Sequence, residues 1–260
     1  LGLAEHAAVA ATVEAVRVKH PRHAGLANAI LRRFLRERDS LAARYSASPA
    51  LRYSHPDWLY QRLAQDWPED VLSILSNNIT EAPVWVRVNQ SRVEDTEKLR
   101  TAWRAQGVES EASPEQARAL KLIDSGQPIL LAGWAQGHFA VQDISVQNAV
   151  RALDIQPGHR VLDACAAPGG KTVQMHDLCP QADILALDVD ARRVRRMEDA
   201  FRRQGVKVDL RAVDAAQVSQ WWDGQRFERI LIDAPCSGTG VIRRQPDILL
   251  HRRESDLPAL

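Results

Sequence analysis

The sequence predicts an α/β protein whose second half forms a parallel sheet with helices on both faces, preceded by a small α+β module and two long helices. From residue 160 onward, aliphatic and β-branched runs alternate with helical stretches, an order that typically builds a parallel sheet. A run of small residues and glycines over 163–172 joins the first of these strands to the next helix. Glycines at that place let a bound nucleotide approach the backbone closely.

Composition excludes several classes of protein. The chain has 260 residues, 45% of them hydrophobic and 26% charged, as in ordinary globular proteins. No apolar run approaches the roughly 18 residues of a membrane span, and the N-terminus does not resemble a secretory signal. Cys165, Cys179 and Cys236 are too few for a disulfide framework, and no Cys/His cluster has zinc spacing. We therefore expect a cytoplasmic protein with no membrane contact and no metal site.

The first half of the chain predicts helices followed by a mixed module. Residues 4–18 are alanine-rich, with their valines broadly on one side, and residues 26–35 repeat apolar side chains at helical spacing. Two helices alone cannot bury a core. Further along, we expect helix starts at Pro56 and Pro68, a strand over 84–88, a helix over 93–106, strands over 129–131 and 138–141, and a helix over 144–154.

The second half places an acid at or beside the end of each predicted strand. The expected strands are 160–164, 184–188, 208–213 and 229–233, and the expected helices are 171–178, 191–204 and 216–222. The acids are Asp163, Asp188, Asp214 and Asp233. Ligands of open parallel sheets bind beyond the carboxyl ends of the strands, where an acid about 20 residues after the glycine loop can accept hydrogen bonds from ribose hydroxyls. Asp188 has that spacing, and Asp214 is placed to read an adenine amino group.

A single acid at a strand end usually caps a turn, but four around one glycine loop favour a nucleotide site. The loop has neither the G-x-G-x-x-G pattern of dinucleotide-binding proteins nor the spacing of a P-loop, although Gly170-Lys171-Thr172 superficially suggests the latter.

Two motifs carry a specific resemblance. Residues 165–171 read Cys-Ala-Ala-Pro-Gly-Gly-Lys, and residues 233–237 read Asp-Ala-Pro-Cys-Ser. They resemble the cofactor and catalytic motifs of the bacterial RNA cytosine-C5 methyltransferases of the Sun/Fmu type, in particular those that act on 16S ribosomal RNA. Residues 240–247 resemble the family segment after the Pro-Cys motif, and residues 27–32 resemble the end of its NusB-like RNA-binding domain. The resemblance therefore covers nearly the whole chain.

This resemblance implies three domains. Residues 1–45 would be the C-terminal part of a NusB-like helical domain, residues 46–142 linker helices and a small RNA-recognition-like α+β module, and residues 143–260 the first part of a Rossmann-like S-adenosylmethionine-dependent methyltransferase domain. Asp188 would bind the ribose of the cofactor, Asp214 the adenine, and Asp233 would lie near the sulfonium and the target base. The methionine part would be held by Cys165, Ala166, Ala167, Pro168, Gly169, Gly170 and Lys171.

The implied reaction is methylation of cytosine C5 in small-subunit ribosomal RNA. A cysteine thiolate adds to C6 and makes C5 nucleophilic enough to take the methyl group; a base then removes the C5 proton and the thiolate leaves. The cysteine of a Pro-Cys motif is the nucleophile in DNA cytosine-C5 methyltransferases. In the RNA enzymes a second cysteine, in a Thr-Cys motif, is the nucleophile. We therefore assign Cys236 to product release, with the nucleophile as its alternative role.

The chain departs from the family at both ends. It has no initiator Met and stops at Leu260 before any Thr-Cys motif, so we expect a fragment whose main nucleophile lies beyond Leu260 and which is inactive alone. Residues 229–233 would then form an unprotected strand edge.

Three basic segments, 17–38, 192–207 and 243–253, accompany the methyltransferase motifs although the net charge is only +1. Residues 192–207 alone hold seven basic side chains against two acidic ones. Such segments are often solvated helix faces, but they also pair with phosphates. Together with the motifs they favour an RNA-binding protein. We expect a monomeric enzyme with ribosomal RNA as its partner.

Other functions stay open. A non-catalytic RNA-binding protein on this fold would explain the missing nucleophile, and relatives of the family modify transfer RNA instead. An amino-group methyltransferase would carry an aromatic residue in the motif after the fourth strand, where this chain reads Asp-Ala-Pro-Cys.

Overall fold

The computed structural model describes residues 4–46, 48–123 and 126–260. The chain divides into two compact units, Ala82–Cys236 and Leu1–Glu81 with Ser237–Leu260. The domain limits expected at residues 45 and 142 remain a prediction.

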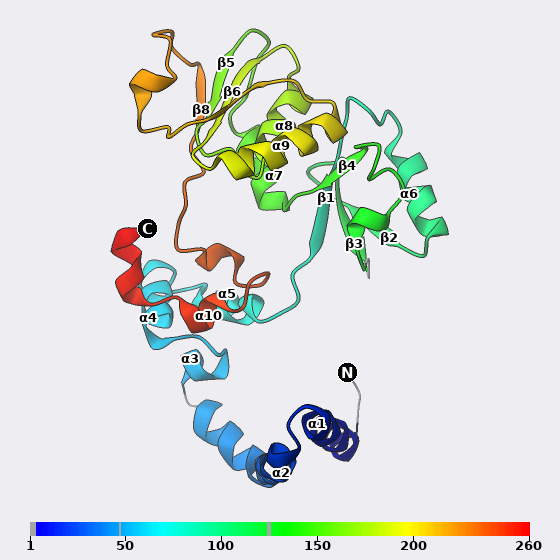
Figure 1. Ribbon diagram of the computed structural model, residues 1–260, viewed down its shortest axis with the longest axis vertical. Coiled ribbons are helices and arrows are strands. Elements are labelled where there is room, and N and C mark those ends of the chain that lie inside the picture. Colours follow the sequence, from blue (N-terminus) through cyan, green and yellow to red (C-terminus); the bar gives the residue numbers. More distant parts are fainter. Residues whose placement is uncertain (1–3, 47, 124–125) are drawn as a thin grey trace. The chain divides into compact units, whose positions relative to one another are not determined.

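The unit Ala82–Cys236 begins with a four-stranded antiparallel sheet of strand order β2-β3-β1-β4 (Figure 1). The long amphipathic helix α6 packs against it and buries Leu99 and Trp103 in a core with Phe139. Trp103 meets the edge of the Phe139 ring at 5.0 Å between ring centroids, a favoured aromatic geometry. The elements are β1 (Val84–Val88), α6 (Thr96–Ala105), β2 (Glu109–Ala112), β3 (Ala119–Ile123), the 3₁₀ turn η2 (Pro128–Leu130) and β4 (Phe139–Val141).

The structure corrects two expectations for this module. The strand expected over 129–131 is wrong, because Pro128 opens a 3₁₀ turn and leaves the side chains of Ile129 and Leu130 53% and 70% exposed. Strands β2 and β3 were not expected. The sequence of β2, Glu-Ser-Glu-Ala, has little strand propensity, and only its pairing with β3 makes it extended.

The rest of this unit is a parallel sheet of strand order β7-β6-β5-β8. All four strands lie where the sequence predicted them, although β8 ends two residues early. The helix expected over 216–222 is only a 3₁₀ turn. The elements are α7 (Ile144–Arg151), β5 (Arg160–Asp163), α8 (Gly170–Leu178), β6 (Asp183–Asp188), α9 (Ala191–Gln204), β7 (Asp209–Ala212), η3 (Val218–Gln220) and β8 (Arg229–Leu231).

Both faces of the parallel sheet are covered. On one face, Met197 and Phe201 of α9 pack against Val173 of α8 and Ala186 of β6. On the other face, Trp221 packs with Leu162, Leu185 and Leu187. Because both faces are buried, β6 reads as a nearly continuous apolar run rather than an alternating one. The edge strand β8 leaves Ile230 half exposed.

A buried polar network joins the two sheets of this unit. The guanidinium of Arg87 on β1 donates to the carboxylate of Asp177 on α8 at 2.6 Å, and both side chains are only 5% exposed. The same carboxylate accepts from the backbone N–H groups of Gln90 and Ser91. At a second contact, the guanidinium of Arg203 lies 4.0 Å from the centre of the Trp134 ring, a stacking contact of the cation–π type.

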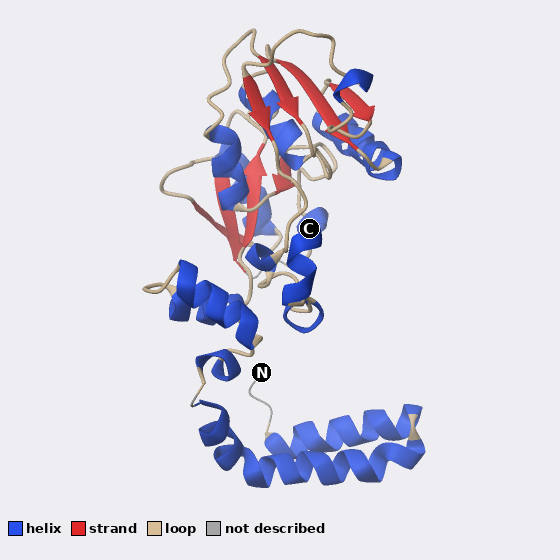
Figure 2. Cartoon of the chain, turned by 90° about the vertical axis from the view of Figure 1, so that its left-hand side faces the viewer, coloured by secondary structure: helices blue, strands red, loops and turns tan. Residues whose placement is uncertain are grey.

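The other unit is helical. Helices α1 and α2 pack as an antiparallel pair (Figure 2). Helix α1 lies where the sequence predicted it, whereas α2 continues eleven residues beyond the predicted end at residue 35. They leave Leu26, Ile30 and Phe34 at least half exposed, so the pair does not enclose a core, as expected. The elements are α1 (Glu5–Lys19), η1 (Pro21–His23), α2 (Ala24–Ser46), α3 (Pro49–Arg52), α4 (Asp57–Asp66), α5 (Val71–Asn78), η4 (Thr239–Val241), α10 (Ile248–His251) and η5 (Glu254–Ala259). Within the described parts of the chain, no helix combines the length and the apolar character needed to cross a bilayer.

We predict that Arg87→Met lowers the free energy of unfolding by about 3 kcal/mol, because it leaves the buried Asp177 carboxylate without its charged partner. Arg202→Met is the matched control. Its guanidinium is 78% exposed and pairs with Asp199 at 3.1 Å, so its removal costs at most about 1 kcal/mol. Urea unfolding followed by tryptophan fluorescence measures both. Equal effects of the two substitutions would contradict a structural role for the buried pair.

Candidate functional site

Four carboxylates meet at one edge of the parallel sheet. Because the strands run parallel, their carboxyl ends share this edge, and the strand order places Asp214, Asp188, Asp163 and Asp233 along it in that sequence. Burial raises the pKa of the Cys165 thiol, and the negative charge of all four carboxylates raises it further. The fields of all four therefore reach the loop that follows β5.

The loop between β5 and α8 is held by the two neighbouring strands. The backbone N–H of Ala164 donates to the carbonyl of Leu231 at 2.9 Å, and that of Ala166 donates to the carbonyl of Leu187 at 2.8 Å. The peptide bond between Ala167 and Pro168 is cis. The small side chains of the loop allow the chain to turn over the sheet edge before α8 begins at Gly170.

The two glycines of the loop have different physical roles. Gly169 has a φ of +94°, which disfavours any L side chain, and a Cβ there would lie 2.8 Å from the ring of Phe201. Gly170 has no such neighbour: a Cβ would meet nothing within 4 Å. Gly169 is therefore required by packing within the protein, whereas Gly170 leaves open space above the start of α8.

Asp188 links the loop to the next helix. Its buried carboxylate accepts from the backbone N–H of Ala167 at 3.1 Å and from that of Asp190 at 3.0 Å, one bond on each oxygen. A carboxylate offers about four acceptor positions, so each oxygen can still accept a hydrogen bond from a diol. The next residue, Val189, presents an apolar side chain to solvent.

Asp163, the last residue of β5, is fully buried. One carboxylate oxygen accepts from the hydroxyl of Thr172 at 2.7 Å, and the other finds no hydrogen-bond partner among the described residues. Burial raises the pKa of Asp163 to about 6, against the opposing effects of Thr172 and Lys171. A buried acceptor without a donor marks a place where a cationic or hydrogen-bonding ligand group would be stabilised. The strand pattern placed Asp163 at this edge but assigned it no ligand.

Asp233 lies two residues beyond β8 and forms an ion pair with Lys171, the second residue of α8. Lys171 is mostly buried, whereas the Asp233 carboxylate is half exposed. The sequence pattern predicted that the loop motif and the Asp-Ala-Pro-Cys motif lie at the same edge. It did not predict that the ammonium of Lys171 and the carboxylate of Asp233 form an ion pair.

Asp214 follows β7 and is partly exposed. Its carboxylate accepts from the backbone N–H of Ala216 at 2.9 Å, which is the usual role of an acid in a turn. No hydrogen bond within the described residues occupies the second oxygen, which can therefore accept from a ligand.

The three cysteines differ in environment. The raised pKa of Cys165 keeps its thiol protonated at neutral pH, which makes it a poor nucleophile. Cys179 is buried at the C-terminal end of α8, the opposite end from the loop. Cys236 is exposed, so it is not a packing residue. Within the described residues, no group of three or more His, Cys, Asp and Glu side chains could hold a metal ion.

Comparison with protein families finds two matches. Residues 150–260 match the family model described as 16S rRNA methyltransferase RsmB/F. Residues 55–128 match the ferredoxin-like domain of RsmF/B-like methyltransferases. The second match includes strands β1 to β3 of the antiparallel sheet and ends before β4.

Curated relatives match over nearly the whole chain. Ribosomal RNA small subunit methyltransferase B of Klebsiella pneumoniae is 43% identical over 256 residues, which are 98% of this chain and 59% of that protein. The protein of the same name from Xanthomonas campestris is 44% identical over 264 residues, covering 100% of this chain and 58% of its own length. The chain thus spans somewhat more than half the length of these relatives.

Solved structures share the fold. A methyltransferase homolog protein from Pyrococcus horikoshii is 27% identical, with a TM-score of 0.66 over 80% of this chain and 66% of its own. NSun6 from the same organism is 19% identical, with a TM-score of 0.69 over 78% of this chain and 76% of its own. The second likeness concerns the fold alone.

We predict that Asp163→Asn removes a pH dependence of stability. The folded pKa of Asp163, about 6, lies above the ordinary value of 3.8. Its contribution to the stability of the wild-type protein is therefore greatest below pH 3.8 and is lost as the pH rises to 6. The loss is on the order of 3 kcal/mol. The asparagine oxygen can still accept from Thr172, so the variant should be more stable than wild type at pH 7.

Urea unfolding at pH 4 and pH 7 measures this effect, with Glu198→Gln, an exposed acid on α9, as the control. Equal pH profiles for wild type and Asp163→Asn would refute the prediction.

Proposed function

Because the chain belongs to the RsmB/F family of 16S rRNA methyltransferases, we propose that it forms the cofactor-binding part of an enzyme that methylates C5 of a cytosine in small-subunit ribosomal RNA. The observation that carries the proposal is the sheet edge at which Asp214, Asp188 and Asp163 surround an open glycine-rich loop. Bound S-adenosylmethionine would supply the methyl group. The proposal includes a monomeric, cytoplasmic enzyme.

The residues at this edge fit that cofactor. Asp188 has a free acceptor position on each oxygen for the two ribose hydroxyls, and the exposed Val189 beside it gives an apolar surface for the adenine. Asp214 accepts from the adenine amino group. The unpartnered oxygen of Asp163 suits the positively charged amino group of the methionine part. The open space at Gly170 admits that part close to the start of α8.

Asp233 and Cys236 are proposed to act on the base. They follow β8, which pairs with β5 and so brings the segment to the same edge as the loop. Asp233 is held by Lys171, and the half-exposed carboxylate can accept a hydrogen bond from the exocyclic amino group of cytosine. Cys236 is assigned to product release: it assists removal of the C5 proton while the nucleophilic sulfur leaves C6. A cytosine within a paired helix would have to leave the stack to reach these groups.

We predict that the chain binds S-adenosylmethionine with micromolar affinity and that Asp188→Asn weakens binding at least tenfold, since the amide loses the charge and one acceptor oxygen. Isothermal titration calorimetry measures this. Asp183→Asn is the control, because Asp183 begins the same strand at the opposite edge of the sheet. It should leave affinity unchanged.

The outcomes separate the candidate functions. Loss of binding in Asp188→Asn alone supports a cofactor site at the predicted edge. A folded wild-type chain that binds RNA but not S-adenosylmethionine would refute the proposal in favour of the non-catalytic RNA-binding protein.

A further inference from the structure

Arginines without acidic partners line one flank of α9. Helical spacing places Arg193, Arg196 and Arg203 on the same side of this helix. Arg193 and Arg196 are exposed, and among the described residues no carboxylate pairs with either of them. The opposite side of the helix carries Arg195 and Arg202, and Arg202 lies 3.1 Å from Asp199. Arg192 follows the same side as Arg196, but its guanidinium lies 3.5 Å from Asp190.

This flank begins beside the glycine-rich loop. Arg193 and Arg196, together with Ala167 and Pro168, line a hollow of about 240 Å³. Two unpaired guanidinium groups around a hollow offer a site for an anionic group, since each can donate to a phosphate through two N–H groups. The hollow therefore has the chemistry of a phosphate site next to the proposed cofactor loop.

The basic flank continues into the ferredoxin-like module. Arg203 stacks on Trp134 and donates to the carbonyl of Trp134 at 3.1 Å. Arg92 donates to the carbonyl of Gln204, the last residue of α9, at 3.1 Å and to that of Gln136 at 2.9 Å. These bonds are to carbonyls, so they fix the positions of both guanidinium groups without neutralising their charge.

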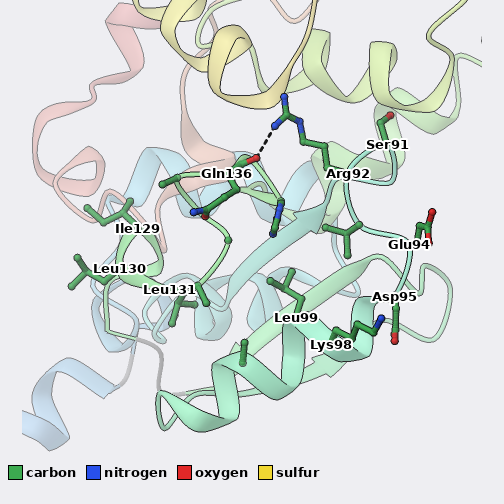
Figure 3. Close-up of a pocket in the computed structure, with 16 residues that line it drawn as sticks. Ser91, Arg92, Glu94, Asp95, Lys98, Leu99, Ile129, Leu130, Leu131 and Gln136 are labelled. Carbon is green, nitrogen blue, oxygen red and sulfur yellow. Dashed lines mark hydrogen bonds between the residues drawn. The ribbon is translucent and has the colours of Figure 1, made fainter.

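A large cavity of about 1050 Å³ lies at the far end of this flank. In Figure 3, Arg92 and Gln136 lie on the side of the cavity nearest the yellow helix α9, and Glu94, Asp95 and Lys98 lie on the other side. The two acids make that other side unsuitable for phosphates. The basic path thus runs from the loop along α9 and ends at Arg92, with the exposed Asp199 beside it between Arg196 and Arg203.

We propose that this basic flank, Arg193, Arg196, Arg203 and Arg92, binds the phosphate backbone of a single-stranded RNA segment. From residue 193 to residue 203 the helix rises about 15 Å, several times the 3.4 Å rise of one nucleotide in a helical strand, so more than one phosphate is within reach. The flank leads a strand from the ferredoxin-like module to the edge of the sheet where the proposed chemistry takes place. This inference rests on the proposed function and adds to it the path of the substrate.

The test compares two double substitutions that remove equal charge from the same helix. Arg193→Gln with Arg196→Gln removes two arginines of the flank, and Arg195→Gln with Arg202→Gln removes two exposed arginines from the opposite side of α9. The affinity of the full 260-residue chain for a fluorescent single-stranded RNA oligonucleotide is measured by anisotropy over a range of salt concentrations. S-adenosylmethionine affinity and thermal unfolding are measured on the same samples.

We expect the first variant to weaken RNA binding about tenfold and to lower the slope of log Kd against log salt by about 1.4, since each phosphate contact with a single strand contributes about 0.7. The control should change the slope by less than half as much. Equal effects of the two variants would show a general attraction of RNA to positive charge and would contradict the proposed path. A wild-type chain that binds S-adenosylmethionine but not RNA would also contradict it. A wild-type chain that fails to bind S-adenosylmethionine would instead contradict the proposed function.

Discussion

The buried ion pair between Arg87 and Asp177 is the interaction on which the geometry of the larger unit depends. Two charges that are 95% removed from solvent are stabilising only if further hydrogen bonds offset the cost of burying them. Asp177 also accepts from the backbone of Gln90 and Ser91, whereas Nη2 of Arg87 has no hydrogen-bond partner among the described residues. Any sliding of β1 along α8 would break several of these bonds at once. These bonds therefore hold the antiparallel module against α8 of the parallel half.

The same network extends toward the proposed cofactor loop through amide side chains. Arg87 donates to the side-chain oxygen of Gln142 at 2.9 Å, and Gln142 donates to that of Gln174 on α8 at 2.8 Å. Asp177 lies in the last turn of α8, and the loop precedes its first residue, Gly170. The nine-residue helix α8 thus has the ion pair between Arg87 and Asp177 at its C-terminal end and the proposed ligand-binding loop at its N-terminal end. A site held by regular elements in this way keeps its geometry better than one built on free loops.

The electrostatics of the edge follow from the same architecture. Parallel strands bring Asp163 and Asp188 to the same edge, where burial disfavours the charged form of Asp163 and the charges of Asp233 and Asp188 disfavour it further. The protein offsets this only in part, with the Thr172 hydroxyl and the Lys171 ammonium near Asp163. A ligand that brings a positive charge would complete the compensation. The edge is therefore less stable alone than with such a ligand, as binding sites often are.

The sequence by itself determined the parallel half of the fold and most of the candidate site. Buried parallel strands leave apolar runs that end at fixed points, and the loop motif specifies its own turn, so Asp188 and the glycines were predictable. It did not predict β2, the turn at 128–130, or the pairing of Lys171 with Asp233. Tertiary structure decided these, because each depends on partners distant in the chain: β3 makes a polar segment extended, and the sheet order brings the end of β8 beside α8. The same holds for Arg87 and Asp177, 90 residues apart, whose partnership leaves no local pattern in the sequence.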